Sequence, residues 1–106
     1  MADRYKVYTG CHNGERPFYY FMKTIYKYPI KITDRQYIVM PFGGRALKGG
    51  LDPQGQPYIW ALVDTTQSEA KYHLAMYGTG HECLAPADDY FDSFNQGSFV
   101  WHVFMR

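Results

Sequence analysis

Tyrosines and lysines in the first quarter of the chain are the residues best suited to binding chemistry. Aromatic faces and cations together can stack single-stranded nucleic acid, tyrosine is enriched in protein interfaces, and aromatic side chains also pair across strands inside a fold. A net charge of only +1 weighs against nucleic acid, for which a basic domain is expected. The predicted partner-binding residues are Tyr19, Tyr20, Lys23, Tyr26, Lys27 and Tyr28.

A second candidate is the tetrapeptide Gly78, Thr79, Gly80 and His81, which follows a predicted strand. Two glycines let backbone N–H groups converge, and such a nest can hold a phosphate. The alternative is a tight turn that needs positive φ twice, with Thr79 as its cap. A dinucleotide fingerprint would need a third glycine and a helix after it. The loop is therefore the alternative ligand site, for a small phosphate-bearing molecule such as a nucleotide.

Histidine, cysteine and acidic side chains are the candidates for metal binding or catalysis. Three imidazoles and a thiolate would suit Zn²⁺, but their spacing is not a strong ligand pattern, and we predict no metal and no cofactor. Cys83 near His81 could act as a nucleophile and base, but no oxyanion hole or orienting acid accompanies them. Adjacent acids in a loop are typical of a solvated turn. We predict no catalytic residue. The candidate side chains for this chemistry are His73, His81, Cys83, His102, Asp64, Asp88, Asp89 and Asp92.

Charge is divided unevenly along the chain. Residues 1–50 carry nine basic and three acidic side chains, and residues 51–106 carry two basic and seven acidic ones. The two halves either interleave in one sheet and cancel, or form a dipolar molecule with a basic and an acidic face. A dipolar molecule would self-associate or dock onto a charged partner, which agrees with an expected homo-oligomer.

The length and composition predict one globular domain over residues 1–106. The chain is 46% hydrophobic and 20% charged, with an unusual 19% of aromatic residues. No run approaches the 18 apolar residues of a membrane helix, and the first residues do not resemble a signal peptide. We therefore expect a cytosolic protein that contacts no membrane, in which Cys11 and Cys83 are free thiols.

Short alternating runs separated by turn signals predict an all-β fold. Two runs form a predicted N-terminal hairpin (4–9 and 18–28), and others follow at 37–40, 45–51, 57–63, 70–77, 90–94 and 98–105. Turns are predicted at 32–36, 43–44, 52–56 and 95–97. The continuous apolar run 57–63 predicts a strand buried on both faces. Because no helical periodicity appears, we expect a single antiparallel sandwich or small barrel of seven to eight strands.

Six blocks occur in a characteristic order, and the last two are the most specific. They are Tyr26-Lys27-Tyr28-Pro29, Thr33-Asp34-Arg35-Gln36, Met40-Pro41, Trp60-Ala61-Leu62-Val63-Asp64, Gly78-Thr79-Gly80-His81 and Phe99-Val100-Trp101-His102-Val103-Phe104. This series resembles a family of small uncharacterised bacteriophage and prophage proteins, over about residues 24–104. The resemblance implies a family core at 24–106, an added hairpin extension at 1–23 and a place in the host bacterial cytoplasm, but no activity.

These observations predict a phage-type, non-enzymatic binding protein. Its expected partner is a host enzyme or an anti-phage defence complex, inhibited through the tyrosine-rich surface. The alternative is a protein that sequesters a small phosphate-bearing ligand at the loop of residues 78–81.

Overall fold

The protein is an all-β domain, as predicted. The computed structural model describes residues 22–106, so the expected hairpin strands before residue 22, together with Cys11, Tyr19 and Tyr20, lie outside the described residues. One single-turn 3₁₀ segment, η2 (Ala87–Asp89), is the only helical element in this part of the chain. The strands are β1 (Lys23–Pro29), β2 (Arg35–Pro41), β3 (Arg45–Leu51), β4 (Pro57–Asp64), β5 (Glu69–Gly78), β6 (Tyr90–Gln96) and β7 (Phe99–Met105).

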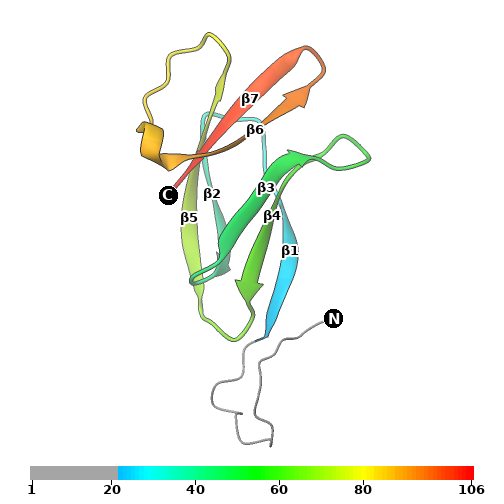
Figure 1. Cartoon of the computed structure of the whole chain (residues 1–106), viewed down its shortest axis with the longest axis vertical. Helices are drawn as coiled ribbons and strands as arrows, with labels where there is room; N and C mark the ends of the chain where they lie inside the picture. Colours follow the sequence, from blue (N-terminus) through cyan, green and yellow to red (C-terminus); the bar gives the residue numbers. More distant parts are fainter. Residues whose placement is uncertain (1–21) are drawn as a thin grey trace, which may run out of the picture.

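Seven strands form two antiparallel sheets that pack as a sandwich and do not close into a barrel (Figure 1). Sheet A has the order β1-β4-β3, and sheet B has the order β2-β5-β7-β6. The chain changes sheet three times, between β1 and β2, β2 and β3, and β4 and β5. Consequently two consecutive strands pair with edge strands from earlier in the chain: β4 pairs with β1 in sheet A, and β5 pairs with β2 in sheet B.

The core lies between the inner faces of the two sheets. In β5, the buried Leu74 and Met76 alternate with the less buried His73, Ala75 and Tyr77, as the predicted period of two requires. Each sheet contributes aliphatic side chains that are almost fully excluded from solvent. The buried cluster comprises Ile30, Ile38, Met40, Ile59, Ala61, Val63, Leu74, Met76, Phe94 and Val103.

The prediction that the 57–63 strand is buried on both faces was wrong. Ile59, Ala61 and Val63 are buried, but Tyr58, Trp60 and Leu62, which alternate with them, are only half-buried. The physical reason is that no second layer of the described residues packs on the outer face of sheet A (Figure 1). The long apolar run therefore supplies one core face and one large aromatic surface.

Turn predictions agree with the structure at the β3–β4 hairpin and at the connection between β2 and β3, which belong to different sheets, and need shifting elsewhere. Gly43 and Gly55 have φ of 81° and 84°, which favours glycine because it lacks a Cβ. The last hairpin turns at Gly97 with φ of 60°, because β6 continues to Gln96 instead of ending at Phe94. The predicted turn at 32–36 is shorter than expected, since β2 already begins at Arg35.

The sheets are joined at one edge by a carboxylate and not by a strand ladder. Asp92 on β6 accepts a hydrogen bond at Oδ2 from the buried backbone N–H of Gly49 on β3, at 2.9 Å. The other oxygen of Asp92 accepts one from Ser93 N at 2.8 Å. Each of these two strands also contains a register shift, between Ala46 and Lys48 in β3 and between Tyr90 and Asp92 in β6.

Candidate functional site

The predicted partner-binding residues of β1 do not lie on one surface. Tyr26 and Tyr28 are paired in register with the buried Ala61 and Ile59, so they belong to the inner side of sheet A. Lys23 and Lys27 have the opposite parity and belong to its outer side. The single aromatic and basic surface expected from the sequence is therefore divided between two faces of the strand.

The two tyrosines on the inner side differ in exposure. Tyr28 packs against the core, and its ring meets that of Tyr26 edge-on, with centroids 6.3 Å apart. Burial, followed by the nearby charges of Glu69 and Tyr26, raises the pKa of the Tyr28 phenol. Tyr26 retains 46% of its exposure because it lies on the edge strand. Tyr28 thus acts in part as a core residue.

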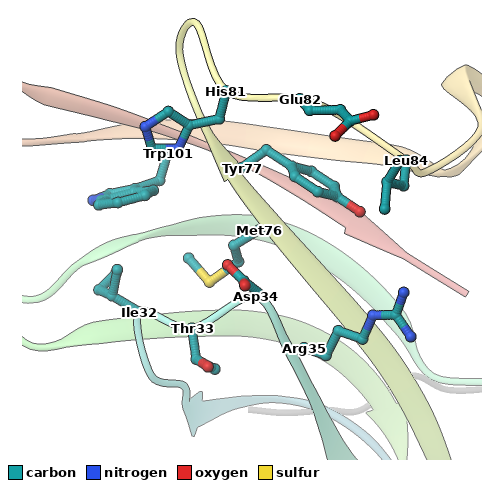
Figure 2. A pocket seen from close by; sticks show the side chains of 10 residues that line it. All are labelled: Ile32, Thr33, Asp34, Arg35, Met76, Tyr77, His81, Glu82, Leu84 and Trp101. Carbon is teal, nitrogen blue, oxygen red and sulfur yellow. The ribbon is translucent and has the colours of Figure 1, made fainter.

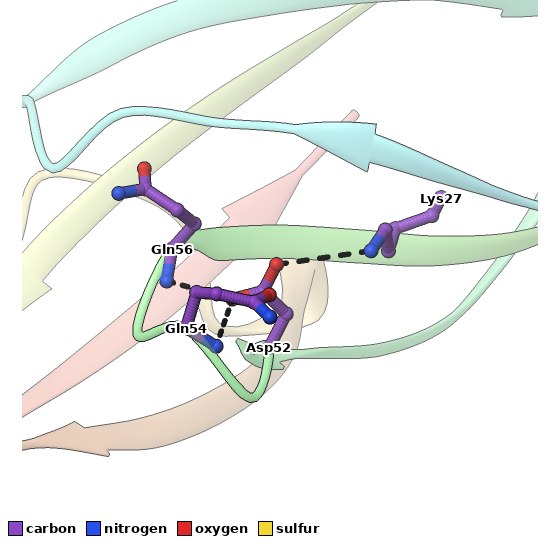
Figure 3. A network of polar contacts seen from close by, with 4 residues as sticks. All are labelled: Lys27, Asp52, Gln54 and Gln56. Carbon is purple, nitrogen blue, oxygen red and sulfur yellow. Dashed lines mark hydrogen bonds and ion pairs between the residues drawn. The ribbon is translucent and has the colours of Figure 1, made fainter.

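Lys27 connects the edge strand to the turn between β3 and β4 (Figure 3). Its ammonium Nζ lies 3.7 Å from Oδ2 of Asp52 and 4.3 Å from the ring centroid of Tyr58. The Asp52 side chain is only 5% exposed, and its Oδ1 accepts N–H bonds from Gln54 and Gln56 at 3.0 and 2.9 Å. The lysine is thereby held over an aromatic ring on the outer face.

The outer face of sheet A carries a row of large side chains along its central strand. Tyr58, Trp60 and Leu62 alternate with the buried residues of β4 and are half-buried. The rings of Tyr58 and Trp60 lie 6.1 Å apart between centroids and are tilted by 44°. Ile25 on β1 lies in register with Leu62 and is 57% exposed, which continues the apolar surface to the sheet edge.

Cations flank this row on both sides. Lys48 is in register with Trp60, and Arg45 is in register with Leu62. A Cβ placed on Gly50 would lie 3.6 Å from Lys48 Nζ and 4.0 Å from Trp60 Cζ3, so the ammonium and the indole meet above this glycine. With the β1 lysines, the outer face of sheet A presents four cations, Lys23, Lys27, Arg45 and Lys48, against two carboxylates: Asp64, in register with Lys23, and Asp52, paired with Lys27.

Basic and acidic side chains are distributed unequally between the two sheets, although each sheet contains strands from both halves of the sequence. Both sheets combine strands from the basic and the acidic half. Sheet A and its hairpin turn carry four basic side chains against Asp52 and Asp64. Sheet B, with the segments joined to it, carries an excess of acids, among them Glu69, Glu82 and Asp88. The molecule therefore combines the interleaving and the charge separation that the sequence left as alternatives.

The loop of residues 78–81 is a turn whose amides are partly used by the fold. Gly80 has φ of 90°, but Gly78 ends β5 without positive φ, so one such position exists where two were expected. Thr79 N donates to Val100 O at 3.2 Å, and His81 N donates to Gly78 O at 3.0 Å. These two N–H groups are not offered to an anion, which weakens the predicted phosphate nest.

Thr79 takes part in a side-chain network that the sequence did not reveal. Its Oγ1 lies 2.7 Å from His102 Nε2, and His102 Nδ1 lies 2.7 Å from Ser93 Oγ. Ser93 Oγ is in turn 2.8 Å from Tyr90 OH. His102 is therefore a strand histidine with a hydroxyl group at each ring nitrogen, and the network ties the loop to β6 and β7.

His81 lines a cavity of about 420 Å³ beside the end of β5 (Figure 2). Figure 2 shows the rings of His81 and Trp101 on one side and the Tyr77 ring and the Leu84 side chain on the other. Gly78 permits this arrangement, since a Cβ there would lie 2.9 Å from the His81 ring. The charged lining is Asp34, Arg35 and Glu82, in which two carboxylates outnumber one guanidinium. This charge balance disfavours a phosphate-bearing ligand.

The candidate residues for metal or thiol chemistry are dispersed over the fold and do not form one site. Within residues 22–106, no three His, Cys, Asp or Glu side chains come together as a metal-binding group. The Cys83 thiol is free and exposed, and its Sγ lies 3.7 Å from the carbonyl oxygen of Ala85. His102 is engaged with hydroxyl groups on both ring nitrogens.

The outer face of sheet A was missed because its members come from three separate segments of the sequence. Alternation within 57–63 could have indicated that Tyr58 and Trp60 share one side. The register that brings Lys27 and Lys48 to their flanks depends on pairings between distant strands.

The fold and this face define a small all-β sandwich domain with an open, basic and aromatic sheet surface. The chain belongs to the family described as Domain of unknown function (DUF7352), whose model matches residues 22–106. That description gives no activity and does not itself support a phage family. No curated protein and no solved structure matches the chain. In the described part of the chain, no helix is long and apolar enough to cross a membrane.

Proposed function

We propose that the protein is a non-enzymatic binding protein that takes an anionic macromolecular partner on the outer face of sheet A. The observation that carries this proposal is the half-buried row of Tyr58, Trp60 and Leu62, bordered by cations on both neighbouring strands. An open sheet surface of this kind provides large contact area at low conformational cost. The cations supply attraction to negative charge and speed association.

Inhibition of a host enzyme or defence complex is the biological role that we propose for this binding. The proposal follows the resemblance to phage proteins, and a domain of this kind would act by covering a surface of its partner. The exposed aromatic and aliphatic side chains support binding, since contiguous apolar surface rimmed by polar groups marks interaction sites. Ile25, which is exposed at the sheet edge and lies in register with Leu62, would extend the same contact.

A matched pair of charge reversals tests the proposed face. The double variant Arg45→Glu/Lys48→Glu changes the outer face of sheet A, and Lys31→Glu/Lys71→Glu makes the same change in net charge elsewhere. Heparin serves as a generic polyanion. We expect the first variant to elute from immobilised heparin at clearly lower salt than the second, because local cations determine polyanion binding. Equal elution of the two variants would remove the proposed face.

A further inference from the structure

The two rings at the centre of the outer face of sheet A have the arrangement of a stacking surface. Tyr58 and Trp60 are separated by one residue on the central strand, so both project on the same side. Their centroids lie 6.1 Å apart, and both rings remain half-buried. Sheet-borne aromatic side chains placed in this way stack two or three successive bases in single-stranded RNA recognition modules.

Gly50 leaves space beside the indole. This residue is buried and faces outward next to Tyr58 in the register. A Cβ at this position would come within 4.0 Å of Trp60 Cζ3. With no side chain here, the flexible Lys48 lies beside this edge of the ring, and a lysine side chain can move aside for a ligand at little cost.

Lys27 and Lys48 lie against the outer face of sheet A, where they could contact the phosphates of a bound ligand. Lys27 Nζ lies 4.3 Å from the Tyr58 centroid on one flank and 3.7 Å from Asp52 Oδ2, so a phosphate there would share the ammonium with this carboxylate. Lys48 Nζ on the other flank lies 3.4 Å from the carbonyl oxygen of Gly49. A strand of nucleic acid lying along β4 would place its bases on the rings and its phosphates beside these two ammonium groups.

The positive charge of the outer face of sheet A favours nucleic acid over a second copy of the chain as its partner. A two-fold contact between two outer faces would bring the cations of one copy against those of the other, which is unfavourable. Duplex DNA would offer phosphates but hide the faces of its bases. Unpaired bases offer a face to every aromatic ring, whatever the sequence.

We infer that the outer face of sheet A binds single-stranded nucleic acid, with bases stacked on Tyr58 and Trp60 and phosphates beside Lys27 and Lys48. This inference rests on the proposed function, because it names the anionic partner of the same face. Binding is independent of base sequence and weakens as salt rises.

The test uses the full chain and a fluorescent oligothymidylate of about 12 nucleotides, within the usual range of site sizes. We expect the oligonucleotide to bind and to quench tryptophan fluorescence. Trp60→Ala should weaken binding by about 5- to 150-fold, the range for loss of one stacked base. The matched control is Tyr37→Ala, which removes an exposed ring on sheet B that also lies under a lysine, 4.6 Å from Lys71 Nζ. It should bind like the wild type.

A charge variant keeps the inference testable if Trp60→Ala does not fold. Lys48→Glu alters an exposed side chain and should weaken oligothymidylate binding while the thermal melt stays close to that of the wild type. Circular dichroism of each variant checks the fold.

The outcomes separate the inference from the proposed function. Equal affinity for oligothymidylate, duplex DNA and heparin would overturn stacking and leave an anion-binding face. Binding of an acidic protein without any oligonucleotide binding would also overturn the inference while the proposed function stands. Absence of binding to every polyanion would remove both.

Discussion

Asp64, at the end of β4, shows how one side chain can organise a connection between the sheets. Its Oδ1 accepts hydrogen bonds from Thr66 N at 3.0 Å, Thr66 Oγ1 at 2.6 Å and Met22 N at 3.4 Å. Partial burial is the largest single influence and raises the pKa, but the hydrogen bonds from Thr66, Met22 and Gln67 together outweigh it. The net result is a pKa below the ordinary value of 3.8.

This lowered pKa predicts a contribution to stability that depends on pH. A carboxyl group with a lower pKa in the folded state stabilises the fold above its unfolded pKa, and that contribution is lost as pH falls through the folded pKa. We expect Asp64→Ala to be less stable than the wild type near pH 6, with a smaller difference at about pH 2.5, because the wild type loses this contribution as the pH falls below the unfolded pKa and through the folded pKa. Urea unfolding at the two pH values measures this.

Asp88→Ala provides the control for the pH experiment. Asp88 is an exposed carboxylate in η2, away from the connection between β4 and β5. The explanation for Asp64 fails if its alanine variant keeps the same deficit in unfolding free energy at both pH values.

The turn between β3 and β4 is the element whose geometry depends most on one buried side chain. Asp52 accepts two backbone N–H bonds through Oδ1, and its backbone bonds to Gly55 N and Gln56 O close the turn at 2.8 Å each. Asp52→Ala should lower the free energy of unfolding by about 1–3 kcal/mol, since it leaves N–H groups without their acceptor. Denaturant unfolding measures the loss.

Two further variants separate hydrogen bonding from charge in this turn. Asp52→Asn keeps an amide oxygen as an acceptor and should lose much less stability. Lys27→Met removes the 3.7 Å ion pair with a half-exposed lysine, which is worth less than about 1 kcal/mol. If Asp52→Asn is as damaging as Asp52→Ala, the ion pair and not the turn is the dominant contribution.

Elements whose signal is local could be predicted from the sequence. The Pro53 to Gly55 turn, the alternation in 70–77 and the absence of a long helix all follow from neighbouring residues and agree with the structure. The division of the β1 tyrosines and lysines between two faces follows from the two-residue period, yet composition alone suggested one surface. The shift between Ala46 and Lys48 in β3 has no local signal, and it determines that Lys48 flanks Trp60.

At the scale of the whole molecule, Asp92 holds the two sheets together at the β3–β6 edge. Asp92→Ala removes a side-chain acceptor of the buried Gly49 N–H and should cost about 1–3 kcal/mol of unfolding free energy. We expect the Gly49 amide to exchange with solvent faster in this variant, while Asp92→Asn, which retains an oxygen acceptor, protects it better. Hydrogen exchange followed by NMR reads this amide directly. Unchanged Gly49 protection in Asp92→Ala would show that the carboxylate does not join the sheets.

The sequence showed that its first half is basic and its second half acidic, but it could not show how these charges are divided between the two sheets. Pairing of early with late strands mixes the halves, so the basic outer face of sheet A arises from β1 and β3 together. Neither strand order nor sheet membership can be read from composition, since both depend on contacts between residues far apart in the chain.

The pairing of β1 with β4 has a consequence for how the chain is made. Lys23 pairs with Asp64, and Pro29 pairs with Tyr58, so β1 emerges from the ribosome well before its neighbour exists. During that interval a tyrosine-rich strand has exposed backbone groups and no sheet to join, a state prone to aggregation. Lys23 and Lys27 place positive charge on that nascent segment, and such charges act as gatekeepers against self-association. The lysines on the outer face of sheet A would therefore also protect the unfinished protein.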